Sequence, residues 1–402
     1  MSDFSFYLVT DPHYFDESFG RSGSAYEARS RTDQKCVAET PAILDAGFAQ
    51  IAADRETRVI LIPGDLVYRG EYQSHVGFRK RLYRLQEAGK KIYLITARHD
   101  YAENPCEFIG DRTVPVAGME RSDLRDFYRE FGFDDAIAEH RESMSYVAQL
   151  APGLRLLALN CDGDCKDFKG LWPEQLDWAV AQIQAAHAAG ERIIAMTHYP
   201  LLPFSAVMGL IGDAHLTDWE QTANTLADAG LELIFTGHMH AQAVTEHISP
   251  AGNTITDVQT GCFVGCPCAY RKVTVAPDGQ VNIRSYTIDD FDYDKGGRTA
   301  AEYLQYMLLF CGLNLMAQSV NTTVLDGIFC AGGDAKFDMQ GNIGAMWCFS
   351  VPLGFLAAFW LKLPVMVVYC IVNLDEIVKL PAVYLHYKKY VWVRNITRDI
   401  EE

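Results

Sequence analysis

Short apolar runs rich in β-branched and aromatic residues alternate with longer segments of mixed polarity through the first 240 residues. The short runs predict strands, and the longer ones, with apolar positions three or four apart, predict helices. The predicted strands are Phe4–Val9, Arg58–Ile62, Lys91–Ile95, Leu154–Leu159, Arg192–Met196 and Leu231–Phe235. The predicted helices are Lys35–Asp54, Glu71–Ala88, Pro173–Ala189 and Asp218–Ala229. Alternation of this kind predicts a layered α/β domain.

The pattern changes to strands alone beyond residue 253. Strands are predicted at Thr254–Val258, Tyr270–Val275 and Gln280–Thr287, with Asp278-Gly279 as the hairpin turn between the last two. The stretch Tyr101–Glu142 is polar and shows no clear period. We therefore expect it to be an irregular cap or lid beside a site.

The last hundred residues differ in character from the rest. A run of Asp, Gly and Lys near Asp289–Arg298 indicates a linker, so a domain is predicted at 1–290, a linker at 291–300 and a hydrophobic helical segment at 301–402. Ile343–Leu361 is nineteen uncharged residues long, which suits a membrane span. Tyr303–Leu325 is also uncharged but holds four amide side chains, so a span and a buried or interfacial helix both remain open for it.

Composition narrows the function and the location. The formal net charge is −17 and the sequence has no basic patch, which argues against nucleic-acid binding. Met1–Thr10 has no basic region followed by an apolar one, so no signal peptide is predicted and the first domain is expected in the cytoplasm. Two groups of the eleven cysteines, Cys161 with Cys165 and Cys262 with Cys266 and Cys268, allow a zinc site. Neither group has a matching second pair, so reduced thiols are favoured.

Five short motifs with histidine or aspartate follow five of the predicted strands. Because the carboxyl ends of neighbouring strands meet at one edge of a layered sheet, we expect these side chains to address one pocket. Imidazole and carboxylate groups are suitable ligands for Zn, Mn or Fe. The motifs are Asp11-Pro12-His13, Gly64-Asp65, His99-Asp100, His198 within Thr-His-Tyr-Pro, and Gly237-His238-Met239-His240.

The order of these motifs resembles that of the calcineurin-like metallophosphoesterase family. The resemblance implies a β-sandwich flanked by helices and the hydrolysis of phosphate mono- or diesters by a metal-activated water. It implies one divalent ion on Asp11, His13 and His240, a second on His198 and His238, and Asp65 bridging the two. His99 would be the general acid, oriented by Asp100. A phosphorylated small-molecule or lipid-like substrate is expected.

One position departs from the family's pattern. The family usually carries Asn before the catalytic histidine, as a ligand of the second metal, and this chain has Arg98 there. Arginine has no acceptor lone pair and cannot ligate a metal. Arg98 either weakens the second metal and partly replaces its charge near the phosphate, or points to solvent. A non-catalytic metal-binding module therefore remains an alternative.

The C-terminal segment resembles the last helices of multidrug and toxin extrusion (MATE) transporters. The matching stretches are Ala331–Phe337, Val351–Phe355, Asp375–Leu380 and Trp392–Thr397. A transporter needs two multi-helix halves, and this segment is a part of one. Transport by this chain alone is not expected, although a transport component with a regulatory phosphoesterase-like domain remains an alternative.

Charge predicts how this segment would lie in a membrane. Ile343–Leu361 would cross outward and Leu363–Tyr384 would return. The tail carries Lys388, Lys389 and two arginines, which the positive-inside rule places in the cytoplasm together with the first domain. A tethering hairpin and a fusion artefact remain the two interpretations of the segment.

Overall fold

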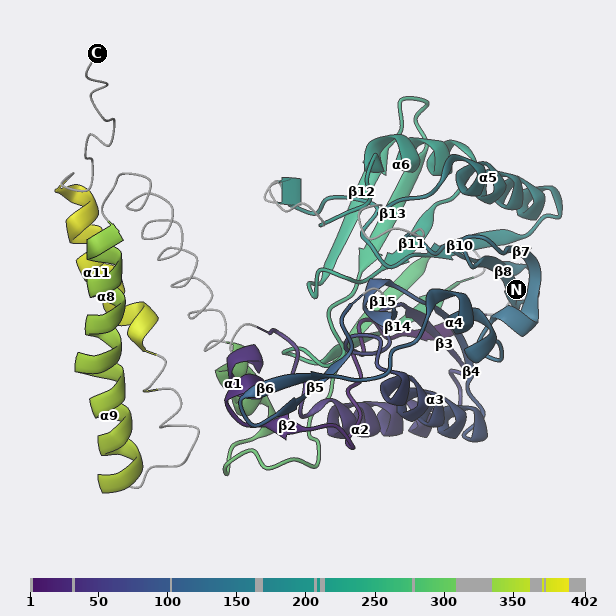
Figure 1. Cartoon of the computed structure of the whole chain (residues 1–402). Coiled ribbons are helices and arrows are strands. Elements are labelled where there is room, and N and C mark those ends of the chain that lie inside the picture. Colours follow the sequence, from purple (N-terminus) through teal and green to yellow (C-terminus); the bar gives the residue numbers. More distant parts are fainter. Residues whose placement is uncertain are drawn as a thin grey trace, which may run out of the picture. The chain divides into compact units, whose positions relative to one another are not determined.

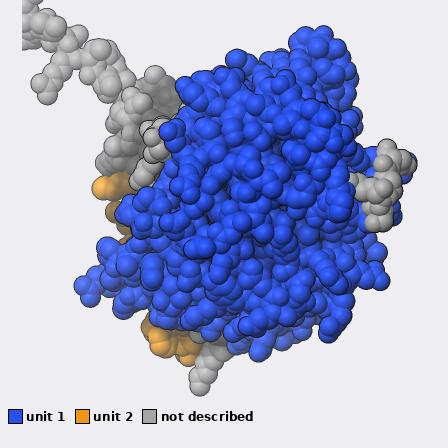
Figure 2. All heavy atoms as spheres, turned by 90° about the vertical axis from the view of Figure 1, so that its right-hand side faces the viewer, with its two compact units in different colours: residues 1–27, 35–305 blue, residues 28–34, 306–402 orange. Residues whose placement is uncertain are grey.

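The computed structural model describes residues 3–30, 33–101, 103–162, 169–205, 208–209, 214–276, 279–308, 335–361, 371 and 374–389. The chain divides into two compact units (Figure 2). The first consists of residues 1–27 and 35–305, and the second of residues 28–34 and 306–402. The first unit therefore includes the predicted linker, 291–300.

One large sheet of the first unit has five strands in the order β15-β14-β1-β3-β4. β1, β3 and β4 are parallel neighbours, and β14 pairs antiparallel with β1. All five residues of β3 are buried, because helices α2 (Thr40–Ala53) and α3 (Tyr72–Glu87) connect these parallel strands. The strands are β1 (Phe4–Leu8), β3 (Val59–Pro63), β4 (Lys91–Ile95), β14 (Ala269–Val275) and β15 (Val281–Thr287).

A second sheet has seven strands in the order β12-β13-β11-β10-β9-β8-β7. Helices α5 (Pro173–Ala188) and α6 (Trp219–Asp228) pack on it, and their apolar residues share one core cluster with those of β10 and β11. The strands are β7 (Ala136–His140), β8 (Ser145–Ala151), β9 (Leu154–Ala158), β10 (Arg192–Met196), β11 (Leu233–Thr236), β12 (Ala243–Ile248) and β13 (Thr254–Gln259).

The strands of the two large sheets lie between α2 and α3 on one side and α5 and α6 on the other (Figure 1). Side chains of the two sheets contact each other in the core. The Phe6 ring of β1 lies edge-on to the Phe235 ring of β11, with their centroids 5.2 Å apart. The Tyr146 hydroxyl of β8 donates a hydrogen bond of 2.9 Å to the Leu94 carbonyl of β4. The predicted α/β fold, with sheets flanked by helices, is therefore confirmed.

The segment predicted to be irregular, Tyr101–Glu142, is largely regular, so that prediction was wrong. It forms a hairpin of β5 (Cys106–Ile109) and β6 (Arg112–Pro115), the short helix α4 (Arg121–Phe127) and β7. The hairpin joins β2 (Arg21–Ser22), which precedes helix α1 (Ser24–Ser30), in a small third sheet. These strands are only four residues long or less and partly exposed, so no hydrophobic period marks them.

All nine predicted strands form, and β4 and β10 have the predicted bounds. The hairpin of β14 and β15 also forms, although Asp278 of its predicted turn lies outside the described residues. The first predicted helix begins later than expected, at Thr40, because residues 37–39 form turns and Pro41 occupies the first helical turn. Strands β8 and β12 were not predicted.

The second unit contains one long helix among its described residues. It runs through α8 (Ala335–Ala345), α9 (Val351–Phe355) and the π-helical turns η5 (Met346–Ser350) and η6 (Leu356–Trp360). Within it, Met339–Trp360 has 22 residues, a mean hydropathy of 1.6 and thus the length and composition of a membrane span. Among the described helices it is the one that meets this test, and one such helix is weak evidence of a membrane.

A second helix of this unit, α11 (Asp375–Lys388), packs against α8, with the rings of His386 and Phe337 stacked 3.7 Å apart. The helical prediction for Ile343–Leu361 agrees with the structure. Within the predicted return span, Leu363–Tyr384, residues 363–370, 372 and 373 lie outside the described residues, as does Tyr303–Leu325 beyond residue 308.

Candidate metal centre

Five of the six predicted metal ligands have left-handed backbone conformations. The φ angles are 53° at Asp11, 39° at His13, 53° at Asp65, 69° at His238 and 53° at His240. L-residues rarely adopt such angles, and each costs on the order of 1–3 kcal/mol. The five residues follow β1, β3 and β11, so the strain is concentrated where these strands end. Strain of this kind is typical of functional sites.

Two glycines let the strand ends approach each other closely. A Cβ on Gly237 would lie 2.6 Å from Asp11 Oδ2, and one on Gly64 would lie 2.7 Å from the Ala97 Cβ. Gly64 also has a φ of +91°. Any side chain at either position would push a motif residue or its neighbour away from the centre.

The carboxylate of Asp65 lies between histidines from both large sheets. Its Oδ2 is 3.1 Å from His198 Nε2 and 3.7 Å from His13 Nε2. The Nδ1–H of His198 donates to the Pro63 carbonyl at 2.9 Å, which turns Nε2 toward Asp65. The Asp65 side chain is only 2% exposed. It therefore has the position of a bridging group.

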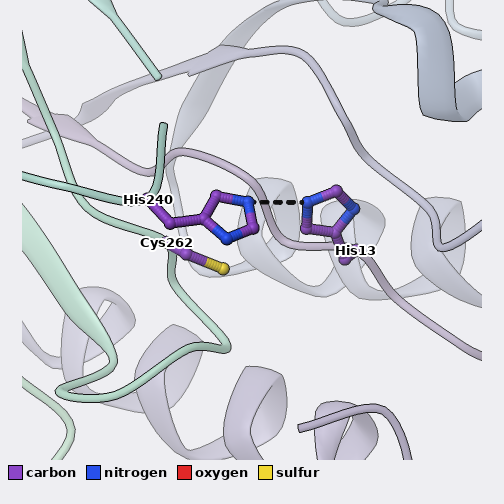
Figure 3. Close-up of side chains that lie close together, drawn as sticks. All are labelled: His13, His240 and Cys262. Carbon is purple, nitrogen blue, oxygen red and sulfur yellow. Dashed lines mark hydrogen bonds between the residues drawn. The ribbon is translucent and has the colours of Figure 1, made fainter. Parts of the chain in front are cut away.

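A first group of ligand atoms surrounds His13. Its Nε2 lies 3.2 Å from His240 Nε2 (Figure 3), and Asp11 Oδ1 is 3.9 Å and 3.7 Å from these two nitrogens. The His238 N–H donates to the Asp11 carboxylate at 3.1 Å. Cys262 completes the group, since its Sγ and the two imidazole nitrogens all lie within 4.8 Å of one another.

In two further groups, the ligand atoms also lie within 4.8 Å of one another. One group is Asp65 with His198 and His238, and the other is His13 with Asp65 and His99. The Tyr199 ring packs against His238 with centroids 4.2 Å apart. All six predicted ligands are thus brought together, three of them from each of the two large sheets.

Burial and mutual charge govern the ionisation of the centre. Burial raises the pKa of Asp11 to about 7. Burial by itself would raise the pKa of Asp65. The nearby His198, His99 and His13 have the larger combined effect and hold the Asp65 pKa well below its usual range. Burial and the nearby charge of Lys35 lower the pKa of His240 to about 3, and they lower that of His13 strongly. These two imidazoles are therefore neutral, as metal ligation requires.

The residues present fit divalent ions. One buried nitrogen, His13 Nδ1, has no hydrogen-bond partner among the described residues, and an unsatisfied buried polar atom is costly. A compact set of carboxylates and imidazoles is the donor set of Zn, Mn or Fe. The expected cofactors, two divalent ions, thus have ligands within reach.

His99 lies beside this set of ligands on the short turn η1 (Arg98–Asp100). Its Nδ1 bonds the Tyr68 carbonyl at 2.7 Å, and its backbone N–H donates to Asp65 Oδ1 at 3.1 Å. The prediction that Asp100 orients the His99 ring is wrong. The Asp100 carboxylate instead accepts hydrogen bonds from the backbone N–H groups of Ala97 and Val67, at 2.8 and 3.1 Å. Asp100 shapes the turn, and a backbone carbonyl orients the imidazole.

Arg98 does not point freely into solvent. Its Nε lies 3.5 Å from Glu103 Oε1, and its side chain is 34% exposed. Its charge also acts on Tyr199, the neighbour of His238, and opposes the rise that burial imposes on the Tyr199 pKa. The Arg98 side chain is thus paired with Glu103, and its charge reaches Tyr199.

Sequence reasoning missed two residues of the centre. Cys262 is a free cysteine, as predicted, but its Sγ also donates to the Asp11 carbonyl at 3.2 Å. Lys35 is predicted as the first residue of a helix, yet its charge reaches His13, His99 and His240. Neither residue has a motif around it, because each is brought to the centre by a loop from elsewhere in the chain.

Comparison with known proteins places this geometry in a family. The model of the calcineurin-like phosphoesterases matches residues 4–242. A dimetal phosphatase from Danio rerio is similar in structure, with a TM-score of 0.47 and 14% identity over 71% of this chain and 99% of that one. Purple acid phosphatase PPD1 from yellow lupin (Lupinus luteus) seeds has a TM-score of 0.48 and 14% identity, over 71% and 52%.

No curated protein matches this chain. The family match does not reach the C-terminal segment, whose resemblance to MATE transporters stays a prediction. Because the match spans more than half of the chain and includes every motif of the centre, the chain belongs to the calcineurin-like phosphoesterases, a family of hydrolases that use divalent metal ions.

Proposed function

We propose that this chain hydrolyses phosphate mono- or diesters with the help of two divalent ions. The observation that carries the proposal is the position of Asp65, whose Oδ2 lies 3.1 Å from His198 Nε2 and 3.7 Å from His13 Nε2. A buried carboxylate flanked by imidazoles on two sides can bridge two cations, and a paired centre is suited to phosphoryl transfer.

Asp11, His13 and His240 would hold one ion, and His198 with His238 the other. Ions bound there polarise the phosphoryl group and lower the pKa of a coordinated water to near neutrality. The buried carboxylates keep the ligand set compact, and the low pKa of His13 and His240 leaves their ring nitrogens unprotonated.

His99 would donate a proton to the leaving alkoxide. Its Nδ1 is engaged by the Tyr68 carbonyl, so Nε2 is the nitrogen left for the substrate. Burial and the charge of Lys35 lower the pKa of His99, which makes its protonated form a stronger acid. Asp100 supports this role indirectly, by holding the turn on which His99 lies.

Arg98 would partly supply, through its guanidinium, the charge that a fully ligated second ion would provide. Its charge, which acts on the Tyr199 ring that packs against His238, supports this proposal. In an Arg98→Asn variant we expect tighter binding of the second ion, measured as metal stoichiometry at limiting metal concentration. Unchanged stoichiometry and turnover would count against it.

The substrate is proposed to be a phosphorylated small molecule or a lipid-like ester. The apolar helix Met339–Trp360 supports membrane association, which would give the centre access to phosphate esters at a bilayer surface. We place the phosphoesterase unit on the cytoplasmic side, on the basis of charge in the C-terminal tail.

The test uses the purified full chain in detergent, with metal analysis and hydrolysis of p-nitrophenyl phosphate and bis-p-nitrophenyl phosphate. We expect turnover that requires metal and falls by 10²-fold or more in His99→Ala, on the order of a lost general acid. His187→Ala is the matched control, because His187 lies on α5 and bonds the Gly230 carbonyl instead.

Either of two results would contradict the proposal. Turnover that survives in His99→Ala would remove His99 from the reaction. A metal-loaded wild type that hydrolyses neither ester would favour a non-catalytic metal-binding module.

A further inference from the structure

The backbone of Lys35 is fixed beside the metal centre. Lys35 forms an antiparallel bridge with Gly265, and the N–H of Cys36 donates to the Val264 carbonyl at 3.1 Å. The same loop carries Cys262, whose thiol contacts the Asp11 carbonyl. Residues distant in sequence thus hold the start of this segment against the loop that borders the ligands.

The side chain of Lys35 extends toward the general acid. Its Nζ lies 5.7 Å from the centroid of the Tyr68 ring, within the range of a cation–π contact. The carbonyl of that same tyrosine binds His99 Nδ1. Lys35 as a whole is half-buried.

The charge of Lys35 acts on three histidines of the centre. After burial, it is the largest cause that lowers the pKa of His13, of His99 and of His240. Coulombic effects fall with distance and with solvent screening. Lys35 is thus the cation whose charge acts on all three rings.

A protonated lysine at this position cannot ligate a metal ion, and its positive charge opposes metal binding. Two divalent ions exceed the charge of the two carboxylates Asp11 and Asp65, so the loaded centre repels an ammonium. An anion bound between the metal ions and the ammonium is attracted by both, so the ammonium then stabilises the complex. A phosphoryl group carries that charge on oxygens that accept hydrogen bonds from lysine.

We propose that Lys35 is a further catalytic residue, which binds a non-bridging oxygen of the substrate's phosphoryl group and favours dianionic monoesters over monoanionic diesters. This inference rests on the proposed function. The face of Tyr68 and the bridge to Gly265 hold the lysine in place before substrate arrives, so little freedom is lost on binding.

The test compares Lys35→Met, Lys35→Gln and Lys35→Arg in the metal-loaded full chain. Methionine keeps an apolar stem over Tyr68 without charge, glutamine supplies a second uncharged variant, and arginine restores the charge. Lys80→Met is the matched control, since Lys80 is an exposed lysine of α3. The readouts are metal content, equilibrium binding of inorganic phosphate, and kcat/KM for p-nitrophenyl phosphate and bis-p-nitrophenyl phosphate.

We expect the Kd for inorganic phosphate to rise about tenfold or more in both uncharged variants, as for a lost charged hydrogen bond. The ratio of kcat/KM for monoester over diester falls, Lys35→Arg recovers part of both effects, and metal content is unchanged. Phosphate affinity and substrate ratio equal to those of Lys80→Met would overturn the inference, and so would loss of metal from the uncharged variants.

Phosphate binding separates this inference from the proposed function. If the wild type turns over neither ester, the change in phosphate Kd still decides whether Lys35 binds the anion. If turnover is normal and phosphate affinity does not depend on Lys35, the phosphoesterase stands and the role of Lys35 does not.

Discussion

Backbone strain at Asp11, His13, Asp65, His238 and His240 shows what single residues contribute to this centre. Each adopts a left-handed φ that costs stability and turns a ligand atom toward its neighbours. The surrounding sheets must supply the free energy that maintains these conformations. Glycines next to these residues, such as Gly64, let the strand ends approach each other closely.

We predict that Gly64→Ala destabilises the protein by about 3 kcal/mol, from a left-handed φ and an overpacked contact. The added Cβ would lie 2.7 Å from the Ala97 Cβ and 3.1 Å from His198 Nδ1. Urea denaturation measures the loss. Gly89→Ala is the control, because Gly89 has a similar φ of +85° with nothing within 4 Å of the added atom. Equal losses would show that the contact is unimportant.

A buried histidine predicts how stability depends on pH. His75 Nδ1 lies 2.8 Å from the Tyr128 hydroxyl and Nε2 lies 2.9 Å from the Asp100 carbonyl. Burial lowers the His75 pKa to about 4. The folded state therefore binds this proton less readily than the unfolded chain, whose histidine has a pKa near 6.5. The stabilisation is complete above pH 6.5 and is lost as pH falls toward 4.

The expected loss is about 3 kcal/mol of unfolding free energy between pH 7 and pH 4. His75→Gln removes the titrating group, so its stability should fall less steeply over the same range. Urea denaturation of both proteins at several pH values checks this. Parallel slopes would mean that His75 is not the group responsible.

At the scale of elements, the centre joins strand ends of two sheets. Asp11 and His13 follow β1 and Asp65 follows β3, whereas His198 follows β10 and His238 follows β11. Bound ions would therefore link the five-stranded sheet to the seven-stranded one. Removing them also leaves buried carboxylates close to one another, which is unfavourable.

We predict that chelation lowers the melting temperature of the first unit by roughly 5 to 10 °C, for ions bound well above their Kd. Calorimetry of the full chain with EDTA, and again after Mn²⁺ is restored, measures the shift. Asp65→Ala, which lacks the bridging carboxylate, should show a smaller shift. Identical melting with and without metal would argue against a structural role for the ions.

Elements differ in how well sequence pattern predicts them. Lys91–Ile95 is predicted with its observed bounds, because four of its five residues form a buried apolar run and polar residues stand at both ends of that run. Strand β12 (Ala243–Ile248) escaped notice, since its side chains alternate between half-buried and exposed. Its pairing with β13, rather than its own hydrophobicity, makes it a strand.

At the scale of the whole molecule, a phosphoesterase unit is followed by a second unit with an apolar helix. Large side chains of that helix stay exposed, including Trp347, Phe355, Phe359 and Trp360. Exposed apolar surface of this extent is typical of contact with lipid or another protein. We propose lipid, because Met339–Trp360 has the length of a membrane span.

We predict that the full chain floats with liposomes in a density gradient and stays bound in high salt, since apolar burial is not screened. The double variant Phe355→Lys and Phe359→Lys should float markedly less. Ile248→Lys is the control, because Ile248 is 65% exposed on β12 of the first unit. Flotation unaffected by the double variant would point away from this helix as the anchor.

The sequence by itself determined the layered α/β fold and the gathering of six histidine and aspartate side chains, the predicted ligands, at one centre. Both depend on local signals: apolar periods, and histidine or aspartate placed directly after strands. Parallel strands bring their carboxyl ends to one edge of the sheet. Residues that directly follow such strands in the sequence therefore lie close together in space.

Only the tertiary structure decided the surroundings of Asp100, Lys35 and Cys262. Asp100 binds backbone N–H groups instead of the His99 ring, and the other two reach the centre on loops held by contacts distant in sequence. Contacts between residues distant in sequence produce no hydrophobic period and no local motif by which they could be predicted. The surroundings of a side chain become visible only once the sheets have placed these loops.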